Sequence, residues 1–161
     1  MDIKNLIALS MVKGVGPSFI KNNISRIELA VDCYSIIKNK KPEQEKYLED
    51  YLAKSESIIN DCILEGIDII SLVSPEYPSL LKEISNPPCV LYMMGNRKLI
   101  SKCIAIIGTR NSSELGNRIA SRLGEYFSKD YSICNGLVEG IDENSIYSNG
   151  GVVNNVVGII S

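Results

Sequence analysis

The run from residue 103 to residue 110 most narrowly limits what this chain can fold into. Residues 103–107 are apolar or small and predict a buried strand. Gly108 permits a tight turn, and an amphipathic helix is predicted over residues 113–128. Because a helix N-terminus presents free backbone N–H groups, this strand–loop–helix unit predicts an anion site.

Polar side chains in this first loop strengthen that prediction. Arg110 carries a planar guanidinium that can bind a phosphate through two hydrogen bonds. Either Ser112 or Ser113 is expected to cap the helix, and the same hydroxyl is a candidate phosphate contact. The candidate binding residues here are Gly108, Thr109, Arg110, Ser112, Ser113 and Gly116.

A second glycine-rich turn follows the strand predicted over residues 131–134. Its candidate phosphate-binding residues are Asn135, Gly136 and Gly140. The carboxyl ends of parallel strands lie at one edge of a sheet, where such folds bind ligands, so both loops are expected there. Asp142 is either a ribose or base contact or the cap of the short helix that follows.

Charge is distributed unevenly along the chain. The whole chain has 17 basic and 19 acidic residues, a net charge of −2. Between residues 97 and 122, however, the sequence contains six lysines and arginines and only one acidic residue, a glutamate. Local fields steer ligands more than the total charge does, so this segment predicts a basic face for a nucleotide or nucleic acid.

Several classes of function are disfavoured by composition. The chain has no histidine and its five cysteines form no Cys-x-x-Cys pair, so no metal, no cofactor and no catalytic residue is predicted. Scattered thiols are typical of a reducing compartment. The sequence has neither a signal peptide pattern nor eighteen consecutive apolar residues, so we expect a cytoplasmic protein without a membrane partner.

The chain is predicted to contain two domains. Residues 1–65 have helical periodicity, interrupted at Gly14 and Gly16, with Pro17 suited to the first position of a helix. Residues 66–161 alternate strands with helices and predict a parallel α/β sheet. Its strands are expected over residues 67–73, 89–94, 103–107, 131–134 and 152–160. The helix over residues 113–128 is expected to direct Leu115, Ile119, Leu123, Tyr126 and Phe127 inward.

An ordered series of motifs resembles the DNA-processing protein A (DprA/Smf) family. Most of the chain, from about residue 6 to residue 160, takes part in the resemblance. The motifs are Gly14-Val15-Gly16, Tyr77-Pro78-Ser79-Leu80-Leu81, Pro87-Pro88 with the strand to Asn96, Ile106-Ile107-Gly108-Thr109-Arg110, and Asn135-Gly136 with Gly140-Ile141-Asp142.

The resemblance implies a fold and a function. It implies an α/β protein in which an N-terminal helical region, of helix-hairpin-helix or SAM-like type, precedes a partial Rossmann-like parallel sheet. It also implies a DNA-binding protein, not an enzyme, that binds single-stranded DNA and helps load a RecA-type recombinase in DNA uptake (transformation) and DNA recombination. Phosphates would lie on the first loop, with Arg110 as the main charged partner.

The sequence departs from the family pattern in the second loop. The family usually reads Ser-Gly-x-Ala-Arg-Gly-Ile-Asp there, whereas this chain has Asn135 first and Glu139 in place of the arginine. A carboxylate at that position would repel phosphate. The family's Ala-His pair is replaced near Asn144-Ser145, and the chain ends about half-way through the expected Rossmann domain. The chain is therefore expected to be either a fragment or a truncated, diverged relative.

Other functions stay open at this stage. One is a nucleotide-binding sensor or a phosphoribohydrolase-like enzyme, although the Pro-Gly-Gly-x-Gly-Thr loop of such enzymes is absent. Another is a degenerate protein-interaction module. The turn at residues 14–16 is either a phosphate-holding hairpin helped by Lys13 and Lys21 or a packing element. Residues 152–160 are apolar and uncharged, which predicts self-association into a homo-oligomer.

Overall fold

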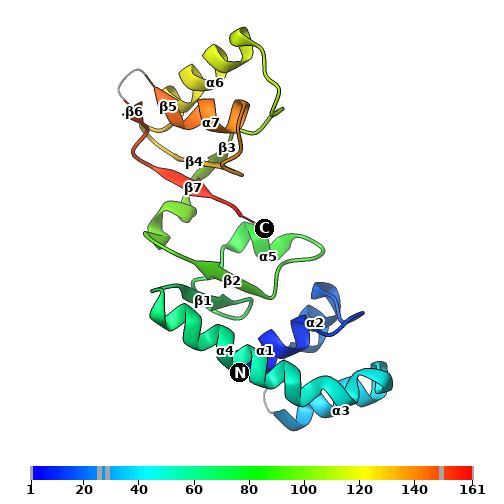
Figure 1. Ribbon diagram of the computed structural model, residues 1–161. Coiled ribbons are helices and arrows are strands. Elements are labelled where there is room, and N and C mark those ends of the chain that lie inside the picture. The colour runs from blue at the N-terminus through cyan, green and yellow to red at the C-terminus, as the bar shows by residue number, and fades with distance from the viewer. Residues whose placement is uncertain (1, 25–26, 28–29, 149–150, 161) are drawn as a thin grey trace. The chain divides into compact units, whose positions relative to one another are not determined.

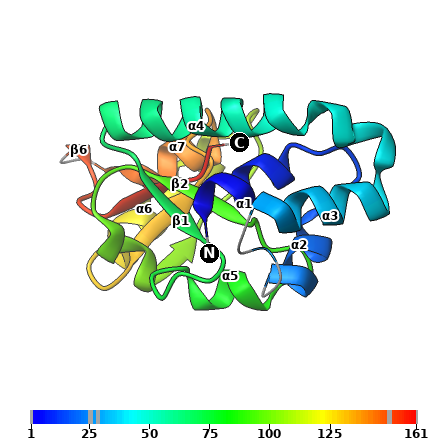
Figure 2. The same cartoon turned by 90° about the horizontal axis from the view of Figure 1, so that it is seen from below.

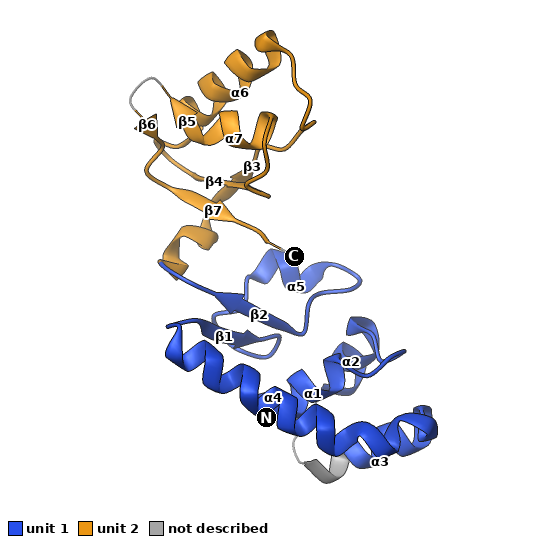
Figure 3. Ribbon diagram, in the orientation of Figure 1, with its two compact units in different colours: residues 1–95 blue, residues 96–161 orange. Residues whose placement is uncertain are grey.

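The computed structural model describes residues 2–24, 27, 30–148 and 151–160 (Figure 1). The chain forms two compact units, residues 1–95 and residues 96–161, which are described separately below (Figure 3). The division at Gly95 differs from the predicted domain boundary at residue 65, because a pair of strands belongs to the first unit. The domain boundary at residue 65 stays a prediction.

Unit 1 is largely helical, as the periodicity of its first 65 residues predicts. The Asp2 carboxylate accepts the Lys4 N–H at 2.9 Å and caps the first helix. Gly14 has a φ of +88°, which a glycine adopts without strain, and Pro17 begins the second helix as predicted. The helices are α1 (Ile3–Ser10), α2 (Pro17–Asn23), α3 (Ala30–Lys40), the 3₁₀-helix η2 (Pro42–Tyr47) and α4 (Leu48–Leu64).

The hydrophobic core of unit 1 lies between these helices. Helix α4 runs alongside α1 (Figure 2). Leu6, Leu9, Ile37 and Leu48 are fully buried there. Burying one such side chain stabilises the fold by about 1.5–3 kcal/mol, so this cluster is the main source of stability for the unit.

Two strands complete unit 1, and here one prediction is wrong. Strands β1 (Asp68–Ser71) and β2 (Val90–Met93) pair antiparallel with each other and do not join the parallel sheet. A parallel pair needs a crossover that covers the sheet, usually a helix. The connection here holds only the five-residue helix α5 (Ser79–Glu83), whose Leu80 is 84% exposed.

Unit 2 contains the predicted parallel sheet. Strands β3 (Cys103–Ala105), β4 (Ser132–Asn135) and β7 (Val156–Gly158) are parallel neighbours in that order. Helix α6 (Glu114–Phe127) links β3 to β4, as predicted. The unit also holds the 3₁₀-helix η3 (Arg97–Ser101), helix α7 (Ile141–Ile146) and the hairpin of β5 (Tyr147–Ser148) with β6 (Gly151–Val152). This topology confirms the mixed α/β class with a partial Rossmann-like sheet.

Helices α6 and α7 pack closely against each other beside the sheet (Figure 1). Gly124 makes this approach possible: a Cβ placed there would lie 2.7 Å from the carbonyl carbon of Ser145. Ala120, one turn earlier, is also buried. The small residues of α6 therefore face its partner helix, and its large apolar residues do not.

Two predictions of burial in unit 2 are consequently wrong. Of the α6 side chains expected to point inward, Leu115, Ile119, Leu123 and Tyr126 are exposed, and only Phe127 is half-buried. The predicted strand at residues 103–107 is not buried either: Cys103, Ala105 and Ile107 are exposed. β3 lies at the edge of the three-stranded sheet and α6 contacts α7 through glycine and alanine, so neither element is covered on its apolar side.

The last predicted strand, residues 152–160, is interrupted. It forms two short strands, β6 and β7, because Val153 turns inward and donates its N–H to the carbonyl of Ile146. Ile159 and Ile160 beyond β7 are 63% and 84% exposed. Self-association through this segment stays a prediction. None of the helices in the described ranges is long and apolar enough to cross a membrane.

The packing of α6 on α7 gives a first prediction. We expect Gly124→Ala to lower the free energy of unfolding by about 2 kcal/mol, because overpacking a tight contact costs 1–3 kcal/mol. The matched control is Gly116→Ala on the same helix, where a Cβ would lie 3.3 Å from the Ile141 side chain. Urea denaturation of both variants checks this, and equal stability of the two would contradict it.

Candidate nucleic-acid interface

The two glycine-rich loops meet at the carboxyl edge of the parallel sheet, as predicted. The first loop, residues 106–113, follows β3, and the second, residues 136–140, follows β4. They lie in direct contact at Gly140, where a Cβ would be 2.7 Å from the Cα of Arg110. Gly140 also has a φ of +92°. Only glycine fits both the conformation and the space, so this residue joins the loops.

The Asp142 carboxylate links the same two loops through hydrogen bonds to their backbones. Asp142 is 4% exposed. Its Oδ1 accepts the Gly108 N–H at 3.1 Å, and its Oδ2 accepts the Gly136 N–H at 2.9 Å. Hydrogen bonds to a charged acceptor are stronger than neutral ones. Asp142 is therefore a positioning residue. The sequence predicted either a ligand contact or a helix cap, and neither describes this role.

The tie also determines which backbone groups a ligand can reach. The N–H groups of Gly108 and Gly136 follow strands and have the position of phosphate donors, but a carboxylate oxygen occupies each of them. Gly108 has no space for a side chain, since a Cβ would lie 2.6 Å from Ile141. These two predicted site residues thus shape the loops.

Asn135 is another predicted site residue with an internal position. It is 3% exposed, and its amide donates to the Asp142 carbonyl and to the Ser145 hydroxyl, both at 2.9 Å. Its side-chain Oδ1 accepts the Leu137 N–H at 3.0 Å. Asn135 therefore fixes the start of the second loop and the first turn of α7.

In the first loop Thr109, Arg110 and Ser113 are exposed, whereas Ser112 is half-buried. Ser113 accepts the Gly116 N–H at 3.2 Å, which confirms the cap of α6. Thr109 accepts the Asn111 N–H at 3.2 Å, and the Ser112 hydroxyl donates to Asn117. The loop is therefore held by its own side chains, next to the N-terminus of a 14-residue helix.

Arg110 stands at the tip of this loop. Its side chain is exposed and forms no hydrogen bond or ion pair with any described residue. The backbone just before it is held by the start of α7, where the Ile141 N–H donates to the Thr109 carbonyl at 3.2 Å. The structure thus presents an unpaired guanidinium on a fixed backbone, which suits an anion.

The surrounding charges are mixed. The six predicted basic residues, Arg97, Lys98, Lys102, Arg110, Arg118 and Arg122, are all exposed in unit 2. Glu139 is also exposed, and it directly precedes the glycine that contacts Arg110. A bound phosphate would therefore be attracted by the arginine and repelled by the glutamate.

The sheet beneath the loops offers no activated thiol. Burial raises the pKa of Cys134, and burial together with Cys134 raises the pKa of Cys103. Both thiols therefore stay protonated near neutral pH, which is unsuited to nucleophilic attack. Across the described ranges, no three acidic or cysteine side chains are grouped to hold a metal ion.

The turn at residues 14–16 has packing contacts in unit 1. Lys21, expected to help hold a phosphate there, donates from Nζ to the carbonyl oxygens of Lys82 at 2.9 Å and Ile84 at 3.4 Å. Ser18 donates to the carbonyl of Ser85 at 3.1 Å. These contacts favour the packing interpretation of this turn.

Comparison with known proteins agrees with the order of the motifs. A model of the family described as DNA recombination-mediator protein A matches residues 68–160. DNA processing protein DprA of Bacillus subtilis is 36% identical over 98 residues, 59% of this chain and 33% of that protein. Protein Smf of Synechocystis is 29% identical over 151 residues, 84% of this chain and 38% of that protein.

A solved structure shows the same fold. The X-ray structure of DNA processing protein A from Streptococcus pneumoniae matches 88% of this chain and 48% of that chain, with a TM-score of 0.55 and 21% identity. This chain therefore spans between a third and a half of the relatives it matches.

These results define the class of protein: an α/β chain with a partial Rossmann-like sheet whose two glycine loops lie at one edge. Because the family model covers more than half of the chain, the chain belongs to the DNA recombination-mediator protein A family, the DprA/Smf family.

The loop tie gives a second prediction. Asp142→Asn leaves one acceptor oxygen for two N–H donors, so we expect faster amide hydrogen exchange at both Gly108 and Gly136. Stability should fall by about 1–3 kcal/mol, the cost of a buried unsatisfied group. The control is Glu143→Gln at the next, exposed position. Exchange that rises at neither glycine would show that the carboxylate does not hold the loops.

Proposed function

We propose that this chain binds single-stranded DNA through the first loop of unit 2, without catalysing a reaction. The observation that carries the proposal is Arg110, an exposed guanidinium without an internal partner on a backbone held by the start of α7. Family membership supports it, because the Bacillus subtilis relative is named as a DNA processing protein.

The contacts are proposed to come from the outer part of the loop. Arg110 would bind one phosphate, with the hydroxyl groups of Thr109 and Ser112 and the N-terminus of α6 beside it. Ser113 and Gly116 would hold that helix end in place. Gly108, Asn135, Gly136 and Gly140 would act indirectly, by holding the two loops against each other.

Helix α6 extends the basic surface beyond the loop. Arg118 and Arg122 are one turn apart and both are exposed. Single strands bind to basic grooves that follow the phosphate backbone, and aromatic side chains provide platforms for bases. Tyr126 is 66% exposed on the same helix. This face is proposed as the continuation of the strand path from Arg110.

A second candidate function rests on the apolar side chains of the same helix. Leu115, Ile119 and Tyr126 are 60%, 49% and 66% exposed, which is unusual for a helix that packs beside a sheet. A protein-interaction module would bind through them. The family resemblance leads us to propose a RecA-type recombinase as a protein partner, with a role in transformation and recombination in the cytoplasm.

The third prediction concerns the charge at the loop tip. We expect Arg110→Ala to weaken binding of a short oligothymidine. The loss of one phosphate contact should flatten the slope of log affinity against log salt concentration by about 0.7. Fluorescence anisotropy at several salt concentrations measures both quantities.

Two further variants make that experiment specific. Lys129→Ala removes one exposed positive charge just beyond the other end of α6 and should change affinity less. Arg110→Lys keeps the charge without the planar fork and should restore binding in part. Equal losses for Arg110→Ala and Lys129→Ala would remove the first loop from the binding site.

The fourth prediction concerns the second loop. Glu139→Arg removes a repulsion beside Arg110 and adds a donor, so we expect tighter binding of the same oligothymidine. The matched control is Asp130→Arg, the same change of charge at an exposed position beyond the end of α6. If both variants gain affinity equally, only total charge matters, and the second loop does not face the strand.

A further inference from the structure

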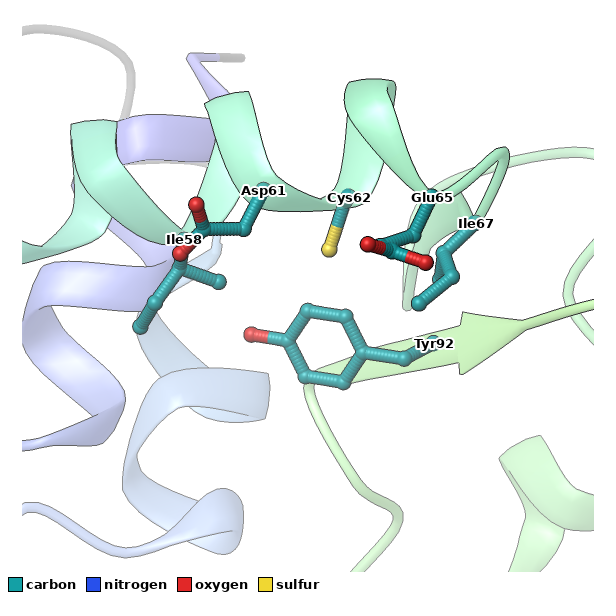
Figure 4. A pocket seen from close by; sticks show the side chains of 6 residues that line it. All are labelled: Ile58, Asp61, Cys62, Glu65, Ile67 and Tyr92. Atoms are coloured by element: carbon teal, nitrogen blue, oxygen red, sulfur yellow. The ribbon is translucent and has the colours of Figure 1, made fainter.

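Unit 1 contains a cleft of its own, which no residue of the two glycine loops lines. It has a volume of about 380 Å³ and lies between the end of α4 and strand β2. Its lining residues are Ile58, Asp61, Cys62, Glu65, Ile67 and Tyr92 (Figure 4). This volume is at the lower end of the range for ligand sites, large enough for one long side chain and part of its neighbour.

The cleft has an apolar wall and an acidic rim. Ile58 and Ile67 lie on either side, and the Tyr92 ring stands opposite α4 (Figure 4). Asp61 and Glu65 are four residues apart on that helix, so their carboxylates share a face beside the ring (Figure 4). Both are exposed, and neither forms an ion pair with another residue of the described ranges.

Cys62 forms the floor of the cleft. Its side chain is only 6% exposed and points from α4 toward the Tyr92 ring (Figure 4). The thiol forms no hydrogen bond with the described part of the chain. A buried free thiol packs as a small apolar group and is only a weak hydrogen-bond donor. The floor of the cleft therefore offers a weak polar group to an occupant.

We propose that this cleft binds an arginine side chain of a partner polypeptide. The guanidinium would lie between the Asp61 and Glu65 carboxylates and against the Tyr92 ring, and its aliphatic stem would enter between Ile58 and Ile67. Arginine fits better than lysine because its planar group stacks on aromatic faces and is less strongly hydrated.

The charge of the surrounding surface agrees with a basic partner. Residues 48–68 include six acidic residues and a single lysine. Unit 1 as a whole has thirteen acidic and ten basic residues, whereas unit 2 has six acidic and seven basic ones. Such a field raises the rate at which a basic segment meets this face. A nucleic acid would be repelled from it.

The probe for the test is a capped tripeptide, acetyl-Leu-Arg-Leu-amide, titrated into the ¹⁵N-labelled 161-residue chain. Its control is the same peptide with citrulline, which keeps the shape and loses the charge. We expect the arginine peptide to shift the amide signals of Asp61, Cys62, Glu65 and Tyr92. The citrulline peptide should bind at least tenfold more weakly.

Two double variants then distinguish binding in the cleft from attraction by the overall negative charge of the helix. Asp61→Asn/Glu65→Gln should lower the affinity at least tenfold. Glu49→Gln/Asp50→Asn, an equal change of charge at exposed positions of the same helix, should leave it within twofold. The amide spectrum of each variant verifies its fold. Equal losses for both double variants, equal binding of the two peptides, or shifts away from the cleft would each overturn the proposal.

Discussion

The two hydrogen bonds that the Asp142 carboxylate accepts from Gly108 and Gly136 hold the functional edge of unit 2 together. Each glycine lies in the loop that follows a strand of the parallel sheet, and the acceptor lies in the first turn of α7. One buried side chain thus fixes both loops and the helix after the second. The exposed position of Arg110 depends on this arrangement, because the backbone beneath it contacts Gly140.

This arrangement changes which groups of the glycine-rich loops can bind a ligand. Backbone N–H groups of glycine-rich loops and helix N-termini are usual donors to phosphate, but here an internal carboxylate accepts two such N–H groups of the loops. The capacity to bind an anion then moves outward, to the loop tip and the start of α6. Glu139 lies at the same place and opposes it, so the binding strength proposed for this edge is a balance of two adjacent charges.

The surface chemistry of the two units also differs. Unit 2 combines exposed arginines with exposed apolar side chains on α6, whereas unit 1 has an excess of acidic residues around a small apolar cleft. A polyanion fits the first surface and a basic polypeptide fits the second. The proposed site for a nucleic acid and the proposed site for a protein therefore have opposite charge requirements and can be tested separately.

Local sequence determined the helices of unit 1, the order of strands and helices in unit 2, and the two loops, because periodicity, glycine and capping residues act over a few positions. Tertiary structure alone decided the rest. β1 pairs with β2 because no covering crossover helix joins them, and α6 turns its glycine and alanine to α7. The Asp142 carboxylate joins the N–H of Gly136, six residues away, to that of Gly108, 34 residues away. These contacts depend on which helices and strands pack against each other, and the local pattern of residues in the sequence does not contain that information.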